Sequence, residues 1–157
     1  MIDPSFTPPV DLRAVAPELT YPLRQAWLRA HQTLSEVAFD GDQARGALHL
    51  AASRTGRVVA VASLLPEPPA PTQGAPALPG DWRLRGMATA PEARRQGLAS
   101  ALIARCAEHA IALGGTALWC HARALAVPFY DALGFVALGS PFQVDSIGLH
   151  VFMWRSL

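Results

Sequence analysis

The sequence predicts a single mixed α/β domain. Two apolar runs of strand length, at 47–52 and 57–65, flank a short turn, as in a β-hairpin. A third such run at 82–89 is followed by an amphipathic helical pattern over 97–113 and a fourth apolar run at 116–120. A strand, a helix and a strand in that order favour a right-handed crossover and parallel pairing. The 157 residues are enough for one domain with an ample core.

Composition narrows the class of protein. With 51% hydrophobic and 16% charged residues, the chain is not expected to be disordered as a whole. A net charge of +1 argues against a nucleic-acid partner. The N-terminus lacks the pattern of a signal peptide, and no apolar run suits a membrane span, so we expect a cytoplasmic protein without a membrane partner. Cys106 and Cys120 are expected to be free buried thiols, and the scattered histidines predict no metal site.

The N-terminal third is predicted to supply a strand and a helix. Residues 1–9 contain three prolines and are expected to be extended or loose, while 10–15 suit a first strand. Pro22 fits the first turn of a helix. We expect its buried face to contain Leu23, Trp27 and Leu28. We expect Arg24 and Arg29 to lie away from that face.

The hairpin and the segment after it are marked by turn residues and proline. Arg54, Thr55 and Gly56 separate the two strand-like runs, and an earlier turn is expected at 40–42. Residues 66–80 form a proline-rich loop that is longer than a connection between two strands requires. Two interpretations stay open for this loop: a tolerated insertion, or a semi-rigid flap or partner surface.

The segment 82–113 organises the rest of the chain. Its helix has an apolar stripe that should pack on a sheet, and Gly114 and Gly115 should end it. The stripe comprises Leu98, Leu102, Cys106 and Ala110, with Ala99, Ile103 and Ile111 beside it. Unpaired N–H groups at the start of the helix, its dipole, Arg94 and Arg95 converge on one point, which suits a phosphate. The alternative is a plain strand-helix crossover with solvated arginines.

The C-terminal segment is predicted to contain one more helix and two closing strands. Pro128 should open the helix and Gly134 should end it. Phe129 and Leu133 should face the core, and Tyr130 is rotated away from them. The closing strands are expected at 135–138 and 147–154, joined through 139–146.

Three motifs carry a resemblance to a known family. Arg94 to Ala99, RRQGLA, matches the signature Q/R-x-x-G-x-G/A of the GNAT superfamily of N-acetyltransferases. Met87 to Glu92 is similar to that family's strand and "PE" turn, and Phe129 to Phe135 resembles its "FYxxLGF" helix. The resemblance covers 48–157 well and the first forty residues loosely. Arg95 stands where many members have glycine, so it narrows the pyrophosphate seat or adds a charge to it.

The resemblance implies a fold, a cosubstrate and a reaction. The fold is the GNAT acyl-CoA N-acyltransferase fold over 1–157: a central, mostly antiparallel sheet with a splayed parallel strand pair and helices on both faces. The cosubstrate is acetyl-CoA, whose pantetheine arm pairs with the backbone of Met87 and Thr89, while 94–100 hold its pyrophosphate. A primary amine of a small molecule or peptide attacks the thioester directly. The residues expected to bind acetyl-CoA are Met87, Ala88, Thr89, Arg94, Arg95, Gln96, Gly97, Leu98, Ala99, Ser100 and His121.

The resemblance also suggests which residues donate and accept protons in the reaction. Tyr130 matches the family's general acid; the alternative is a helix residue with its hydroxyl in water. A backbone N–H near Thr89 would stabilise the oxyanion. His121 would contact the cofactor, act as base or do neither. The base is not evident: the candidates are His121, Glu67, Asp145, His150 or a chain of waters.

The acceptor is the least defined part of the prediction. The candidate contacts are Arg24, Arg29 and His150, with the amine itself unidentified. Basic lining of its site would suggest an acidic metabolite, and acidic lining a polyamine or aminoglycoside. The rival function is a catalytically inactive CoA-binding sensor or interaction module with the same fold. A homodimer through exposed aromatic residues is one further prediction; its alternative is core packing of Trp119, Phe135 and Trp154.

Overall fold

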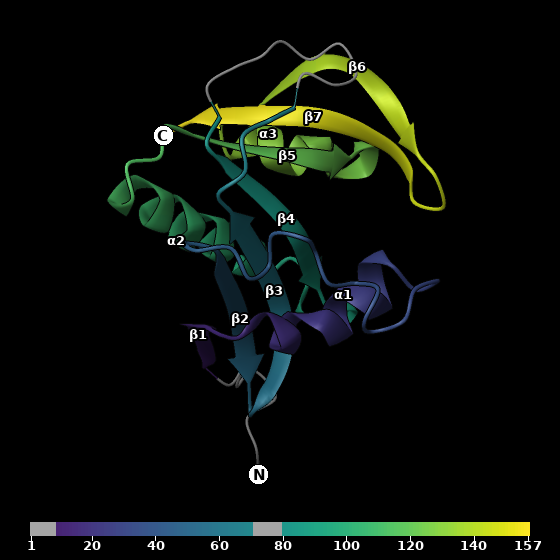
Figure 1. Cartoon of the computed structure of the whole chain (residues 1–157). Coiled ribbons are helices and arrows are strands. Elements are labelled where there is room, and N and C mark those ends of the chain that lie inside the picture. Colours follow the sequence, from purple (N-terminus) through teal and green to yellow (C-terminus); the bar gives the residue numbers. More distant parts are fainter. Residues whose placement is uncertain (1–8, 71–79) are drawn as a thin grey trace.

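The computed structural model describes residues 9–70 and 80–157. Within them, seven strands form one sheet in the order β1-β2-β3-β4-β5-β7-β6 (Figure 1). Every neighbouring pair is antiparallel except β4 and β5, which are parallel. The strands are β1 (Val10–Ala14), β2 (Leu48–Arg54), β3 (Arg57–Leu65), β4 (Trp82–Thr89), β5 (Ala117–Arg123), β6 (Val136–Val144) and β7 (Gly148–Ser156). The helices are η1 (Pro17–Thr20), α1 (Tyr21–Leu28), η2 (Pro91–Ala93), α2 (Leu98–Ala112), η3 (Ala124–Ala126) and α3 (Val127–Ala132).

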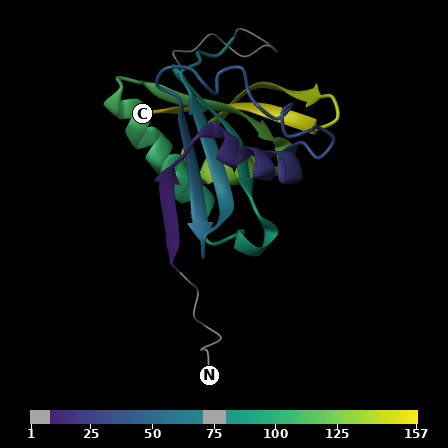
Figure 2. The same ribbon diagram turned by 60° about the horizontal axis from the view of Figure 1, so that its bottom comes forward.

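The two longest helices bury opposite faces of the sheet. Side chains alternate across a strand, so Leu50 and Ala52 of β2 join the main core with α2, while Ala51 between them joins a smaller cluster on the α1 side. Figure 1 shows α1 and α2 on either side of β2–β4, and Figure 2 shows β1 at the edge of the sheet. The predicted mixed α/β fold with helices on both faces is confirmed.

Most predicted elements are present, and two are longer than expected. The first strand, the hairpin, the strand 82–89 and the helix that follows are confirmed. β5 continues past Cys120 to Arg123, so His121 lies within this strand and not after it. β6 likewise extends to Val144, where a loop was expected, because it pairs with β7 again after a register shift.

The parallel pair β4 and β5 separates soon after it forms. Pairing is limited to Trp82 with Leu118 and Arg83 with Trp119. Farther along, β4 contains a bulge in which two residues, Gly86 and Met87, oppose one residue of β3. A Cβ atom at position 86 would lie 2.9 Å from the ring of Phe39, and the backbone φ there is +65°, so glycine fits this position. The divergence opens a gap between β4 and β5.

The burial of α1 differs from the prediction. Trp27 is 43% exposed, whereas Arg24 is fully buried, so the expectation that Arg24 lies away from the core is wrong. Its guanidinium donates to both carboxylate oxygens of Asp42, at 2.7 and 3.0 Å, and to the hydroxyl of Ser63 at 2.7 Å. Burial of an arginine is tolerated here because a carboxylate pairs with it. On α2, Ile111 is also exposed, at 57%, and lies outside the buried stripe.

Two predictions fall on parts of the chain that lie outside the described residues: the loose start at 1–9, except for its last residue, and most of the proline-rich loop, at 71–79. No helix within the described ranges is long and apolar enough to cross a membrane. The core-packing alternative to a homodimer holds for Trp119 and Phe135, which are both buried.

Candidate active site

The start of α2 forms the first part of the site. Gly97 precedes the helix with φ of 79°, and Arg95 in the same turn also has a positive φ, of 58°. The first N–H groups of a helix have no partner within it, so at this end they point outward with the positive end of the dipole. A cavity of about 690 Å³ lies against the turn. Its lining comprises Thr89, Ala93, Arg94, Arg95, Gly97, Leu98, Ala99, Ser100, Leu125, Pro128 and Phe129.

Four of the residues predicted to bind the cosubstrate are not among those that line this first cavity: Met87, Ala88, Gln96 and His121. The side chain of Gln96 donates to the carbonyl of Glu92 and accepts from Arg54. Ala88 is buried on the α1 side of the sheet. His121 lies in a second cavity, described next. Within the first cavity, Arg94 donates from Nε to the Thr89 carbonyl at 3.1 Å, which draws the turn toward the end of β4.

A second cavity, of about 240 Å³, occupies the gap between β4 and β5. Its lining includes three residues of the core on the α2 side: Cys120 and Ala122 of β5, and Tyr130. It also includes His121 and Arg123, which alternate with Cys120 and Ala122 along β5 and therefore lie on the other face of the sheet. The cavity therefore draws its lining from both faces of the sheet.

The same two elements, β4 and α3, contribute to the lining of both cavities. Met87 lines the second cavity and Thr89, two residues later, lines the first. Phe129 and Tyr130 are divided in the same way, with Phe129 in the first cavity and Tyr130 in the second. A ligand seated at the start of α2 and extended along β4 would reach the gap beside Tyr130.

Tyr130 is only 7% exposed. Its ring contacts those of Phe129 and Phe135 edge to face, with centroids 5.1 and 5.4 Å apart. Burial raises the pKa of the phenol, and the nearby thiols of Cys120 and Cys106 raise it further. Tyr130 therefore stays protonated at neutral pH. Its side chain is not in bulk water, which was the alternative interpretation from the sequence.

The two thiols are poorly suited to act as nucleophiles. Burial raises the pKa of Cys106 to about 12 and that of Cys120 to about 12. The thiolate is the reactive form of cysteine, and almost none is present at neutral pH. The predicted free buried state of both cysteines is confirmed.

The two histidines of the second cavity differ in which nitrogen carries the proton. Nδ1 of His121 lies 3.3 Å from Nη2 of Arg83, and a guanidinium can only donate, so Nδ1 accepts and Nε2 holds the proton. Nδ1 of His150 lies 2.8 Å from the carbonyl of Gly148, which can only accept, so Nδ1 donates and Nε2 holds the lone pair. Of the two, His150 therefore has its second nitrogen available to accept a proton.

Four arginines line the second cavity: Arg29, Arg83, Arg85 and Arg123. Arg29 was predicted as an acceptor contact, and the structure places it here together with His150. Arg24 does not line the cavity; it is buried behind it. The sequence analysis did not predict the other three arginines of this cavity, Arg83, Arg85 and Arg123. The patterns R-x-R at 83–85 and H-x-R at 121–123 could have indicated them, because alternate residues of a strand lie on one face.

Comparison with known proteins identifies this architecture. The profile of the acetyltransferase (GNAT) family matches residues 12–135. The uncharacterized N-acetyltransferase YitI of Bacillus subtilis (strain 168) is 36% identical over 149 residues, which cover 94% of this chain and 97% of that protein. Among solved structures, ElaA of Escherichia coli matches with a TM-score of 0.71 at 14% identity, over 93% of this chain and 99% of its own. An acyl-CoA N-acyltransferase of Pseudomonas aeruginosa matches with a TM-score of 0.65 at 22% identity, over 94% and 99%.

The chain therefore belongs to the GNAT acetyltransferase family. It is an N-acetyltransferase, and its family implies an acyl-CoA cosubstrate and an amine acceptor. Within the described residues, no cluster of three or more potential metal ligands occurs.

Proposed function

We propose that this enzyme transfers the acetyl group of acetyl-CoA to a primary amine of a small molecule or peptide, by direct attack while both substrates are bound. The observation that carries the proposal is that β4 and α3 line both cavities, with Tyr130 in one of them and its neighbour Phe129 in the other. One cavity offers a phosphate seat, and the other reaches the opposite face of the sheet. Two substrates entering from different faces can therefore meet in the gap between β4 and β5.

The first cavity fits the pyrophosphate of CoA. A Cβ atom placed on Gly97 would meet nothing within 4 Å, so the space above this residue is open to a ligand. The N–H groups that follow it, with Arg94 and Arg95 beside them, supply donors and positive charge to a phosphate. The divergence of β4 from β5 leaves room for the pantetheine arm to lie along β4 near Met87 and Thr89.

The reaction exchanges one bond for another. The neutral amine nitrogen attacks the thioester carbonyl carbon, a C–N bond forms, the C–S bond breaks, and CoA leaves as a thiolate. An N–H group at the end of β4 would stabilise the oxyanion, as oxyanion holes do in acyl transfer. The proton released by the amine must reach a base, and the thiolate gains from a proton donor.

Tyr130 and His150 suit the two proton roles. The phenol of Tyr130 is protonated and faces the gap, so it can donate a hydrogen bond or a proton to the departing sulfur. His150 carries its lone pair on Nε2 and is the better candidate for the base. His121, with its proton on Nε2, is suited to donate a hydrogen bond instead.

Turnover tests the proposal against its rival, an inactive CoA-binding module. Release of free CoA from acetyl-CoA would be followed with a panel of amines, and each acetylated product confirmed by mass spectrometry. We expect Tyr130→Phe to lower kcat by about 10²–10⁴-fold, a typical value for a general acid, with little change in affinity for acetyl-CoA. Binding of acetyl-CoA without transfer to any amine would favour the rival. An unchanged kcat in Tyr130→Phe would remove this residue from the mechanism.

A further inference from the structure

The second cavity has a strongly unbalanced charge. Arg29, Arg83, Arg85 and Arg123 line it, and none of the described residues in its lining is an aspartate or glutamate. A fifth arginine, Arg24, lies behind the wall but is already paired with Asp42. The remaining cations thus face a cavity without an acidic side chain of its own.

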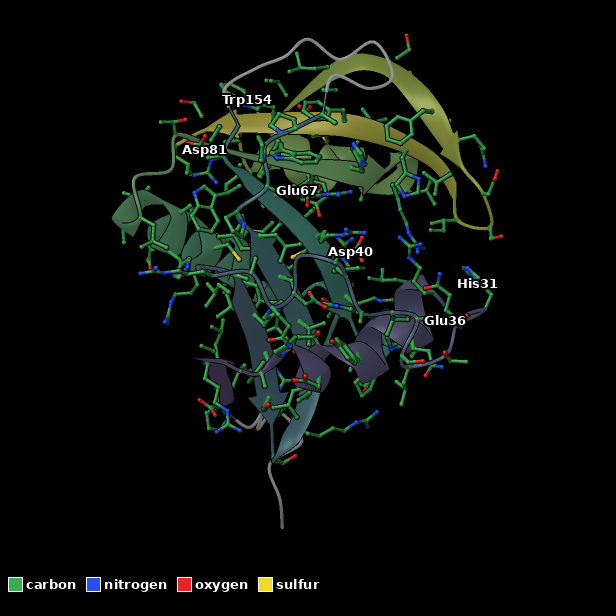
Figure 3. All side chains as sticks on the ribbon, in the orientation of Figure 1. His31, Glu36, Asp40, Glu67, Asp81 and Trp154 are labelled. Carbon is green, nitrogen blue, oxygen red and sulfur yellow. The ribbon has the colours of Figure 1, made fainter. Side chains whose placement is uncertain are left out.

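Within the described residues, hydrogen-bond acceptors are found for two of the four arginines. Arg83 donates to the carboxylate of Glu67 at 3.0 Å, and Arg123 donates to the carbonyl of Leu28 at 2.8 Å. Figure 3 shows Glu67 close to the start of β4, where Arg83 lies. The carbonyl leaves the charge of Arg123 unneutralised, so Glu67 offsets only one of the four charges.

Arg29 and Arg85 are not neutralised in the part of the chain that the structure describes. Neither forms an ion pair with a carboxylate there. The guanidinium of Arg85 lies 3.7 Å from the centroid of the Phe39 ring. This stacking orients the group and attracts it, but a neutral ring cannot cancel its charge.

Two acidic residues do lie nearby, on the outer side of the same pair of arginines. Glu36 and Asp40 share with Arg29 and Arg85 a shallower hollow, and Figure 3 shows both acids on the segment after α1. The Glu36 carboxylate accepts the backbone N–H of Thr33 at 2.6 Å. Neither acid lines the cavity beside Tyr130.

The titration of nearby groups reflects the same positive field. Burial lowers the pKa of Arg85 to about 10, with Arg83 as the next contribution. Burial also lowers the pKa of His121 to about 4, again with Arg83 next. An anion bound between these groups would relieve this repulsion.

We propose that the acceptor is an amine that also carries a carboxylate or a phosphate, and that Arg29 and Arg85 hold this anionic group while the amine points toward Tyr130. This inference rests on the proposed function, because it names the class of acceptor. Guanidinium groups suit both anions, since they can donate two parallel hydrogen bonds. The phosphates of CoA have their own seat, in the other cavity with Arg94 and Arg95.

The same charges would assist the chemistry. Neighbouring positive charge disfavours the ammonium form of an amine and lowers its pKa. More of the bound acceptor would then be the neutral nucleophile at physiological pH, and less would be required of the base. A polyamine, whose additional charges are also positive, would be repelled.

Matched acceptors that differ in one anionic group test the inference. Phenylalanine would be compared with phenylalaninamide to test the carboxylate, and O-phosphoethanolamine with ethanolamine to test the phosphate; spermidine represents a cationic amine. Acetylation would be measured as kcat/KM, and binding of the same compounds by calorimetry in the presence of CoA. We expect at least one compound with an anionic group to exceed its partner without that group at least tenfold in both measurements, and spermidine to be the poorest acceptor.

Substitution of Arg85 assigns the effect to the cavity. Arg85→Met should lower kcat/KM and affinity for the preferred anionic compound about tenfold or more and leave affinity for acetyl-CoA within about twofold. Arg105→Met is the matched control, because this arginine lies exposed on α2 and its loss changes net charge equally. It should change neither measurement.

The possible failures are distinguishable. Acetylation and binding that favour the amines without an anionic group, or spermidine, would overturn the inference and leave the proposed function standing. Acetylation of no amine would count against the proposed function, and the inference would then be judged by binding alone. Equal binding of the members of both pairs, or equal effects of Arg85→Met and Arg105→Met, would overturn it.

Discussion

The buried pair of Arg24 and Asp42 should dominate the stability of the α1 side of the molecule. Arg24 has no exposed surface, and Asp42 is 4% exposed. Asp42 accepts from Nη1 and Nη2 of Arg24 and from the backbone N–H of Phe39 at 2.8 Å. The network connects α1 and the segment at 37–42 to β3. It also lies next to the Phe39 ring, on which Arg85 stacks.

Asp42→Asn keeps the shape of the side chain and removes its charge, which leaves a buried guanidinium unpaired. Breaking a buried ion pair from one side typically costs about 3–5 kcal/mol. For a domain of this size, each kcal/mol lowers Tm by about 2–4 °C, so we expect a decrease of about 6–20 °C. Urea unfolding at pH 7.5, followed by circular dichroism, gives the free energy directly.

A control and a double variant make this prediction specific. Glu108→Gln removes one carboxylate of the exposed pair Arg105–Glu108, which should change the free energy of unfolding by less than about 1 kcal/mol. Arg24→Met with Asp42→Leu removes both buried charges and should recover much of the stability lost in Asp42→Asn, since apolar replacements of buried pairs are often neutral. A loss below about 1 kcal/mol in Asp42→Asn would refute the reasoning.

The pKa of Asp42 gives the sign of the pH dependence. Burial alone would raise it, but the hydrogen bonds from Arg24 and Phe39 outweigh burial and hold the pKa below its ordinary value. The pair therefore contributes stability above the ordinary aspartate pKa of about 3.9, and this contribution is lost as pH falls through the folded-state pKa.

Four further predictions concern the site. Gly97→Ala should cost about 1–2 kcal/mol of stability, because alanine is strained at positive φ, and should raise the KM for acetyl-CoA tenfold or more; an unchanged KM would place the cosubstrate elsewhere. His150→Gln should lower kcat by about 10²-fold or more if this residue is the base, and a kcat within twofold of wild type would exclude the role. His121 has a depressed folded-state pKa of about 4, so the protein should lose stability as pH falls from about 6.5 to 4, and His121→Gln should flatten that part of the curve in urea titrations. Cys106 and Cys120 should react with a thiol reagent only after unfolding, since burial raises both pKa values to about 12; rapid labelling of the native enzyme would contradict their burial.

Local patterns in the sequence were sufficient for most of the fold. The step of four along α2 and the apolar runs of β2 and β3 depend on neighbouring residues, and both are visible in the chain. The turn RRQGLA combines a glycine of positive φ with the start of a helix, which is also a local feature. These elements and the family motifs were therefore predictable.

Features that depend on distant partners were not predictable in the same way. Arg24 looked like a surface residue because its partner, Asp42, is brought to it only by the fold. The full length of β6 depends on pairing with β7, and no propensity in 139–146 indicated it. The tautomers of His121 and His150 follow from Arg83 and Gly148, which the chain alone does not place beside them.

The arginine-lined cavity is an intermediate case. Alternation in R-x-R at 83–85 predicts a shared face, and H-x-R at 121–123 does so on the next strand of the sheet. That these two pairs of residues border one gap follows from the early separation of β4 and β5, which pair only at Trp82 and Arg83. The charges are visible in the sequence, but the place where they meet depends on the separation of β4 and β5 in the fold.

The measurement that tests the central claim most directly is a thermal-shift titration with acetyl-CoA, with free CoA and ATP in parallel. A ligand at about 100 times its Kd adds roughly 2.7 kcal/mol to the free energy of unfolding, which corresponds to a rise in Tm of about 5–11 °C for this domain. We predict such a shift with acetyl-CoA and CoA and none with ATP, and a shift of about half this size or less in Gly97→Ala at the same ligand concentration, because a tenfold weaker Kd leaves about 1.4 kcal/mol. No shift with either CoA species at millimolar concentration would contradict the assignment of the α2 turn as the acetyl-CoA seat.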